Sequence, residues 1–169
     1  MAFVRIKEIK NKSGNKYKYA YLVENKWRKR GAKGSRQKVK GYLGKVHKFD
    51  DSPIIFDKQV EGKEFSEIVR DLVEWELRKK GFEHIDKGLM KKGDFEVDIL
   101  NKKFMKDGKS IVIQSHDGYM CDVTLKKLLK FGGEGEQEDV AYSLANAIVE
   151  AGINVPKDVF VEIFEKIYK

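Results

Sequence analysis

The chain has 169 residues, 41% hydrophobic and 37% charged, so it can bury a hydrophobic core without disulfide staples. Its single cysteine, Cys121, excludes an internal disulfide, and no apolar run approaches the roughly 18 residues that cross a bilayer. No secretory apolar segment follows Met1, because Arg5, Lys7 and Lys10 interrupt it. The sequence therefore predicts a cytoplasmic protein with no membrane partner.

The net charge of +8 is unevenly distributed along the chain. Residues 1–50 contain 16 Lys and Arg against three acidic residues, which gives a net charge of +13. The remaining residues contain 19 Lys and Arg against 24 Asp and Glu, a net charge of −5. Such asymmetry is typical of a polyanion-binding module attached to a more ordinary body.

Alternating side chains predict antiparallel strands in the first fifty residues. Near the start, Val4 and Ile6 fall on one face of the first strand and Arg5 and Lys7 on the other. The stretch 28–36, with its glycines, predicts a loop, and apolar residues resume in 38–46. Together these segments predict a three-stranded meander.

The second predicted strand carries tyrosines on one face. Tyr17, Tyr19, Tyr21 and Val23 alternate with a second set of residues, namely Lys18, Ala20, Leu22 and Glu24. Aromatic residues that alternate along a strand more often cover a core than project into solvent. Core packing is therefore the favoured interpretation for Tyr19 and Tyr21.

The rest of the chain predicts a mixed body. A connector spans 51–63, and helical spacing of apolar residues follows from Phe65 to Lys80. Asp122 is the expected N-cap of the helix predicted at 123–131. The remaining predicted elements are strands at 82–85, 95–100, 103–105 and 110–114, and helices at 123–131, 138–151 and 156–168. The predicted fold is α+β: a basic antiparallel β-meander at 1–50, then a small α+β body at 64–169 that ends in two helices.

The basic meander predicts a nucleic-acid interface. Cations that neutralise phosphates release counterions, and exposed aromatic rings stack on unpaired bases. The loop region 26–38 concentrates such cations, and its two glycines, Gly31 and Gly34, let the backbone approach a phosphate closely. The predicted contact residues are Lys26, Trp27, Arg28, Lys29, Arg30, Lys33, Arg36, Lys38, Lys40, Tyr17 and Tyr42. An acidic protein partner remains an alternative, whereas the absence of a basic amphipathic helix argues against a membrane surface.

Two segments of the meander resemble a known family. The stretch Tyr19 to Glu24 reads YAYLVE, and after a basic gap the stretch Arg36 to Val46 reads RQKVKGYLGKV. This pattern resembles the opening segment of insertion-sequence DDE transposases over residues 17–46. The resemblance implies a nucleic-acid-binding or docking module, and it leaves a transposase-derived adaptor as an alternative function. It does not imply transposition, because the catalytic body of that family is much longer than the remainder of this chain. That remainder resembles uncharacterised archaeal proteins.

A metal-dependent nuclease is the rival hypothesis. Nucleases of the PD-(D/E)xK class place an Asp, then a Glu or Gln, then a Lys along a helix and two strands, to hold Mg²⁺ and to position water. The corresponding candidates here are Glu74 and Glu76 on the helix, followed by Asp98, Gln114 and His116. His116 stands where the class has lysine and is a weaker cation at neutral pH. An inactive relative of that class is a further alternative.

No other catalytic or metal-binding motif is present in the sequence. Cys121 is expected to be a small buried hydrophobic residue, and one cysteine with three scattered histidines matches no zinc-binding spacing. We therefore expect a non-enzymatic nucleic-acid-binding protein, for RNA or DNA, that needs no cofactor or metal. A large ribonucleoprotein such as the ribosome is one expected setting.

Overall fold

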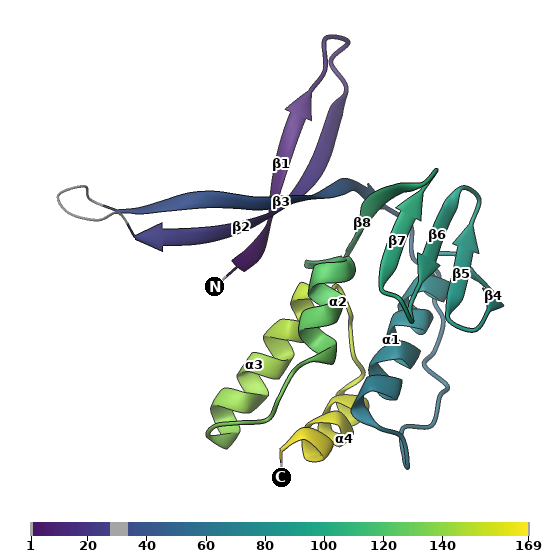
Figure 1. Ribbon diagram of the computed structural model, residues 1–169. Coiled ribbons are helices and arrows are strands. Elements are labelled where there is room, and N and C mark those ends of the chain that lie inside the picture. The colour runs from purple at the N-terminus through teal and green to yellow at the C-terminus, as the bar shows by residue number, and fades with distance from the viewer. Residues whose placement is uncertain (1, 28–33, 169) are drawn as a thin grey trace.

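The computed structural model describes residues 2–27 and 34–168, and in these ranges nine strands form one sheet. The spatial order is β1-β2-β3-β8-β7-β6-β5-β4, and β9 pairs with β8 (Figure 1). The strands are β1 (Ala2–Lys10), β2 (Lys16–Trp27), β3 (Ser35–Lys48), β4 (Glu83–Asp86), β5 (Leu89–Lys92), β6 (Phe95–Asp98), β7 (Lys103–Lys106), β8 (Lys109–Ser115) and β9 (Gly118–Met120). The predicted α+β class and the N-terminal antiparallel meander are confirmed.

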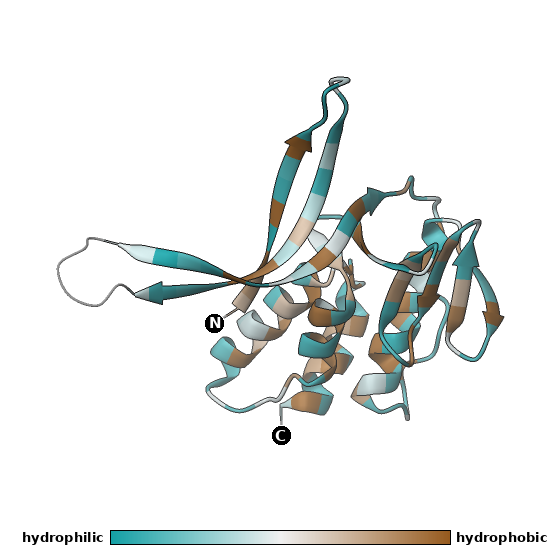
Figure 2. Ribbon diagram, turned by 45° about the horizontal axis from the view of Figure 1, so that its top comes forward, coloured by the Kyte–Doolittle hydropathy of each residue, from teal (hydrophilic) through white to brown (hydrophobic). Residues whose placement is uncertain are grey.

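The first three strands form two hairpin arms that diverge from the body (Figure 1). One arm pairs β1 with β2 from Ala2 opposite Glu24 to Lys10 opposite Lys16. The other arm pairs the second half of β2 with the first half of β3 as far as Trp27 opposite Ser35. Two register shifts on β3, opposite residues 20–23, bend the sheet where the arms cross. Figure 2 shows that the β2–β3 arm is hydrophilic along its outer part and hydrophobic at the crossing.

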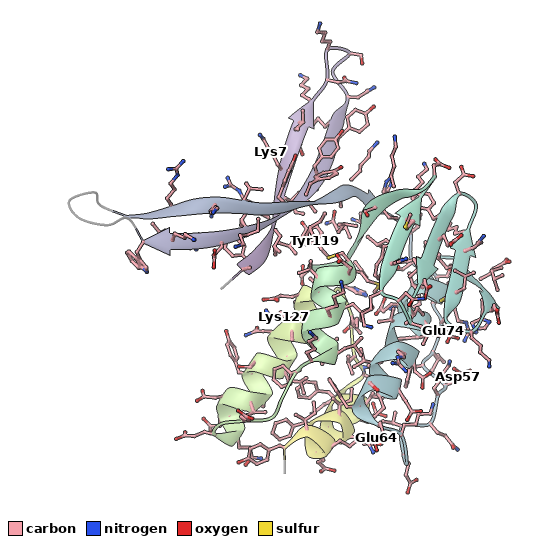
Figure 3. The ribbon with its side chains drawn as sticks, viewed as in Figure 1. Lys7, Asp57, Glu64, Glu74, Tyr119 and Lys127 are labelled. Atoms are coloured by element: carbon pink, nitrogen blue, oxygen red, sulfur yellow. The ribbon has the colours of Figure 1, made fainter. Side chains whose placement is uncertain are left out.

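Strand β3 continues from the arm into the body. Its last residues pair in parallel with β8, from Lys45 opposite Ile111 to Lys48 opposite Gln114. A small buried cluster of Ala20, Val112 and Cys121 fills the junction, with Val4, Ile6, Leu43, Val46, Tyr119 and Val123 packed around it. Figure 3 shows Tyr119 between the crossing of the arms and α2. The sheet therefore continues without a break from the meander into the body, although the predicted connector separates these two parts along the chain.

Four helices complete the described body: α1 (Phe65–Lys79), α2 (Asp122–Leu129), α3 (Gln137–Glu150) and α4 (Lys157–Ile167). Their apolar stripes pack on the strands of the body, and fully buried side chains such as Val73, Met90, Ile113, Leu125, Leu144 and Ile163 form the main core. The connector packs along α1, where the indole N–H of Trp75 donates to the Ile54 carbonyl at 2.8 Å. None of the helices in the described ranges is long and apolar enough to cross a membrane.

Most predicted elements are confirmed within one to three residues at each end, with specific exceptions. Strands β5 and β9 were not predicted, because each is short and lies between turn residues. Cys121, not Asp122, is the N-cap of α2, and the backbone N–H of Cys121 donates to the Thr124 hydroxyl at 3.2 Å. Ser35 and Arg36 belong to β3 and not to a loop, whereas residues 28–33 of that predicted loop lie outside the described ranges.

Candidate nucleic-acid interface

The tyrosines of β2 lie on the open face of the sheet. Side chains of directly opposite residues in an antiparallel pair project from the same face. Tyr17, Tyr19 and Tyr21 lie opposite Ile9, Lys7 and Arg5, respectively, so aromatic rings and cations share one face of the β1–β2 arm. Figure 3 shows Lys7 on this arm, away from the body.

The opposite face of β2 packs on the body through its smallest residue. Ala20 is fully buried against Val112 and Cys121, whereas the tyrosines are only half-buried. The expectation that Tyr19 and Tyr21 pack in the core is therefore wrong. Burial raises the pKa of the Cys121 thiol, which agrees with its expected role as a small buried hydrophobic residue.

Tyr42 of β3 completes the aromatic surface. Its ring centre lies 5.4 Å from that of Tyr21 and 6.4 Å from that of Tyr19. We call the set Tyr17, Tyr19, Tyr21 and Tyr42 the tyrosine face. The ammonium of Lys45 lies 4.2 Å from the centre of the Tyr17 ring, a cation–π contact at one edge of this face.

The tyrosine face is open to a partner. The side chain of Tyr42 is 56% exposed, and a hollow of about 440 Å³ is lined by Ile9, Tyr19, Tyr21 and Tyr42. Partial burial, with Tyr19 and Tyr21 nearby, raises the pKa of Tyr42, so its phenol stays neutral at physiological pH. A neutral phenol keeps its hydrogen-bond donor and adds no negative charge that would repel phosphate.

The outer part of the β2–β3 arm carries the predicted cations. Lys26 lies opposite Arg36, and Trp27, opposite Ser35, is 85% exposed. A hollow of about 520 Å³ lies here, lined by Lys26, Arg36, Gln37, Lys38 and Val39. We call Lys26, Trp27, Arg36 and Lys38 the basic arm. A large exposed indole on an arm rich in cations is an unusual surface feature that fits stacking on a base.

The remaining predicted contact residues fall into two groups. Lys40 lies 3.7 Å from the Glu24 carboxylate, in an exposed ion pair on the same arm. The other predicted residues, namely Arg28, Lys29, Arg30 and Lys33, lie outside the described ranges.

The structure connects the basic arm with the tyrosine face. The Arg5 guanidinium of β1 donates a hydrogen bond to the Gln37 side-chain oxygen of β3. Arg5 lies opposite Tyr21 on the tyrosine face, and Gln37 lines the hollow on the basic arm. The tyrosine face therefore continues over the crossing to Gln37, which pairs with Asn25 on the same face of β2, whereas Lys26, Arg36 and Lys38 lie on the opposite face of the basic arm.

The body adds to this surface cations that the sequence did not predict to lie there. The parallel pairing of β3 with β8 brings the β7–β8 turn beside Tyr19 and Tyr42, so that Lys106 and Lys109 line the same hollow as Lys45. Nothing in the local sequence of residues 106–109 indicates this position. By contrast, the exposure of Arg5 and Lys7 on the β1–β2 arm was indicated by the sequence, because their alternation with Val4 and Ile6 placed them on a polar face.

His47 also lines this hollow, and its charge depends on its surroundings. Burial lowers the pKa of His47, and the nearby ammonium groups of Lys106 and Lys45 lower it further. Its ring packs edge-on against Phe95, with the ring centres 4.9 Å apart. The imidazole is therefore neutral at physiological pH in the free protein, and an anion in the hollow would favour its protonation.

The residues of the nuclease hypothesis do not form one site. His116 Nε2 lies 3.2 Å from the Glu76 carboxylate, so these two residues are brought together. The Asp98 carboxylate instead accepts hydrogen bonds from the backbone and side-chain N–H groups of Asn101, and Glu74 pairs with Lys58 at 3.1 Å. Across the described ranges, no group of three or more His, Cys, Asp or Glu side chains has an arrangement suited to holding a metal ion.

Glu76 is held as part of a buried structural network. Its carboxylate is fully buried and accepts the backbone N–H of Asn154 at 3.0 Å and the Lys79 ammonium at 3.1 Å. The ammonium of Lys80, also fully buried, lies 3.6 Å from Glu76 and 2.6 Å from Asp51. Asn154 and Lys79 donate hydrogen bonds to Glu76, and Lys80 and His116 lie beside it, so this carboxylate ties α1 to the β8–β9 turn and to the loop before α4.

Comparisons of this chain with protein-family models, with curated proteins and with solved structures find no match.

Proposed function

We propose that this protein binds nucleic acid, RNA or DNA, without cleaving it, through the tyrosine face and the basic arm. The observation that carries this proposal is the orientation of β2. Ala20 packs on the body, so Tyr17, Tyr19 and Tyr21 lie on the open face together with Arg5 and Lys7. Aromatic rings beside unpaired cations are the combination that stacks on bases while neutralising phosphates.

The charge distribution supports the same proposal. The excess of positive charge in residues 1–50 is displayed on two arms that project from a body of net negative charge. Cations spread for solubility alone would not gather on one module of the chain. The likeness of residues 17–46 to the opening segment of insertion-sequence transposases points to a docking or binding role for the same module. Phosphate attraction is common to RNA and DNA, so the proposal covers both.

The proposal is tested by measuring affinity for labelled RNA and DNA oligonucleotides at several salt concentrations. The test variant replaces Lys26, Arg36 and Lys38 of the basic arm with Ala. The control variant replaces Lys126, Lys127 and Lys130, which are exposed on and just after α2, and so removes the same charge. We expect the test variant to bind about tenfold more weakly or worse, with a salt slope reduced by about 2, because each phosphate contact contributes about 0.7–0.9 to that slope.

The control variant should bind as the unmodified protein does. Equal weakening in both variants would show that only net charge matters and would remove the basic arm from the interface. Absence of salt-dependent binding in the unmodified protein would refute the proposed function itself.

A further inference from the structure

A second hollow lies between the tyrosine face and the body. Its volume is about 550 Å³, and its lining includes Tyr19 and Tyr42 on one side and the β7–β8 turn on the other. It shares both tyrosines with the hollow of about 440 Å³ on the arm, so the Tyr19–Tyr42 pair separates two adjacent depressions. Ligand pockets typically enclose about 300–1,000 Å³, so the larger hollow has room for a nucleotide.

The lining of this hollow has the chemistry of a nucleotide site. The aromatic rings of Tyr19 and Tyr42 lie on the side of the meander, and Lys45, Lys106 and Lys109 also line the hollow, with Asp107 as the single acidic residue of the lining. None of these three lysines forms an ion pair with a carboxylate in the described ranges. Lys45 and Lys106 instead lie over the Tyr17 and Phe95 rings, at 4.2 and 4.7 Å from the ring centres. These cations are therefore available to phosphate.

The position of the rings distinguishes single strands from duplexes. In a duplex the faces of the bases are covered by their neighbours, so an aromatic side chain can stack only on a base that is unpaired or displaced. The rings that border this hollow, Tyr19 and Tyr42, lie between the cations of the arm and those of the body. A duplex laid on the same cations would leave the exposed Tyr42 ring without a stacking partner.

We infer that the hollow between Tyr42 and the β7–β8 turn holds an unpaired nucleotide, its base against Tyr19 and Tyr42 and its phosphates near Lys45, Lys106 and Lys109, and that the protein selects single-stranded over duplex nucleic acid. This inference rests on the proposed function and names the class of nucleic acid that the interface takes. A rival mode is the entry of the β2–β3 arm into the major groove of a duplex as a two-stranded ribbon. The two modes predict opposite preferences.

The test compares single strands of about 12 nucleotides, in RNA and in DNA, with duplexes of the same sequences, by fluorescence anisotropy on the full chain. Tyr42→Ala removes a ring, Tyr42→Phe keeps the ring and removes the hydroxyl, and Tyr142→Ala removes a tyrosine that is 72% exposed on α3. A second variant, Lys106→Ala with Lys109→Ala, removes the cations of the body side. Thermal unfolding of every variant confirms that it is folded.

We expect single strands to bind at least about tenfold more tightly than duplexes, and Tyr42→Ala to lose about tenfold in single-strand affinity, the effect of one base–aromatic stack. Tyr42→Phe, which keeps the ring, should lose clearly less affinity than Tyr42→Ala, Tyr142→Ala should bind normally, and the double lysine variant should lose affinity for single strands. Equal or tighter binding of the duplex, or no effect of Tyr42→Ala, would overturn the inference and leave the proposed function standing. If neither form binds, both fail. The ratio of RNA to DNA affinity identifies which polymer is preferred.

Discussion

The Lys45 ammonium lies 4.2 Å from the centre of the Tyr17 ring, although Tyr17 belongs to the β1–β2 arm and Lys45 to the end of β3 that joins the body. This contact closes the tyrosine face at the edge where the arm meets the sheet of the body. The orientation of the arm and the pairing of β3 with β8 are therefore parts of one arrangement. A change that disturbs the β3–β8 pairing should disturb the tyrosine face as well.

Gly44 permits that pairing, and its replacement tests how closely β3 approaches β8. Gly44 has a φ of 138°, and a Cβ at this position would lie 2.3 Å from the backbone oxygen of Ser110. Gly44→Ala should lower the free energy of unfolding by about 2 kcal/mol or more, and the unfolding temperature should fall by about 5 °C. Differential scanning calorimetry measures both quantities.

Gly41 is the matched control on the same strand. A Cβ at Gly41 would have nothing within 4 Å, so Gly41→Ala should leave the unfolding temperature unchanged or slightly raised. Similar losses in the two variants would mean that β3 does not approach β8 closely at Gly44.

The buried carboxylate of Glu76 should contribute strongly to stability. Replacing Glu76 with Gln leaves the buried ammonium of Lys80 with one carboxylate partner fewer, and removing one partner from a buried ion pair costs about 3 kcal/mol or more. Urea unfolding of Glu76→Gln should show this loss. In the control Glu96→Gln, which breaks an exposed pair with Lys91, the change should stay within about 0.5 kcal/mol. Comparable effects in both variants would contradict the buried network.

The ion pair between Asp51 and Lys80 predicts a loss of stability in acid. Burial raises the pKa of Asp51, but the hydrogen bond and charge of Lys80 outweigh this effect and hold the pKa below its usual value. A carboxyl group whose pKa is lower in the folded state stabilises the protein above its unfolded pKa of about 4, and this contribution is lost as the pH falls through the folded pKa. The stability difference between the unmodified protein and Asp51→Asn should therefore be constant above pH ~5 and shrink below pH ~4. A difference independent of pH in acid urea titrations would argue against this pair.

We expect no nuclease activity that depends on Asp98. Its carboxylate is held by Asn101, and His116 is engaged by Glu76 rather than placed beside Asp98. Without a lysine in the corresponding position, stabilisation of the developing charge is weakened, and loss of one such contact typically costs ~10²–10³ in rate. Incubation with single-stranded, duplex and hairpin substrates in Mg²⁺ or Mn²⁺ should give no cleavage above background. Cleavage that disappears in Asp98→Ala would refute this expectation.

The sequence predicted the elements of the meander but not which face of β2 covers the body. Alternation assigns the residues of β2 to two faces, and the large apolar surface of the aromatic rings then favours burial of the face that carries Tyr19 and Tyr21. A distant segment determines which residues of β2 are buried: Ala20 packs against Val112 and Cys121, and Val23 is also buried, whereas Tyr19 and Tyr21 are only half-buried. No local pattern in residues 17–24 reports the presence of that segment.

The second feature that local sequence could not provide is the sheet order. The parallel pairing of β3 with β8 joins strands separated by α1 and four short strands, and it places Lys106 and Lys109 beside Tyr42. Periodicity and turn residues determine neighbouring antiparallel hairpins, but pairing between distant strands depends on packing of the whole core. The capping of α2 by Cys121 is a smaller example, since Asp122 has the stronger intrinsic preference for that position.

The most direct test of the proposed interface is an NMR titration of the full isotope-labelled chain with a single-stranded oligonucleotide at low salt. We predict that the largest chemical-shift changes fall on the tyrosine face, on Trp27 and Arg36 of the basic arm, and on Lys106 and Lys109 of the β7–β8 turn. Signals from α3 and α4, on the other side of the body, should change little. Changes concentrated on those helices, or no changes at all, would contradict the proposal that the two-armed meander is the nucleic-acid-binding surface.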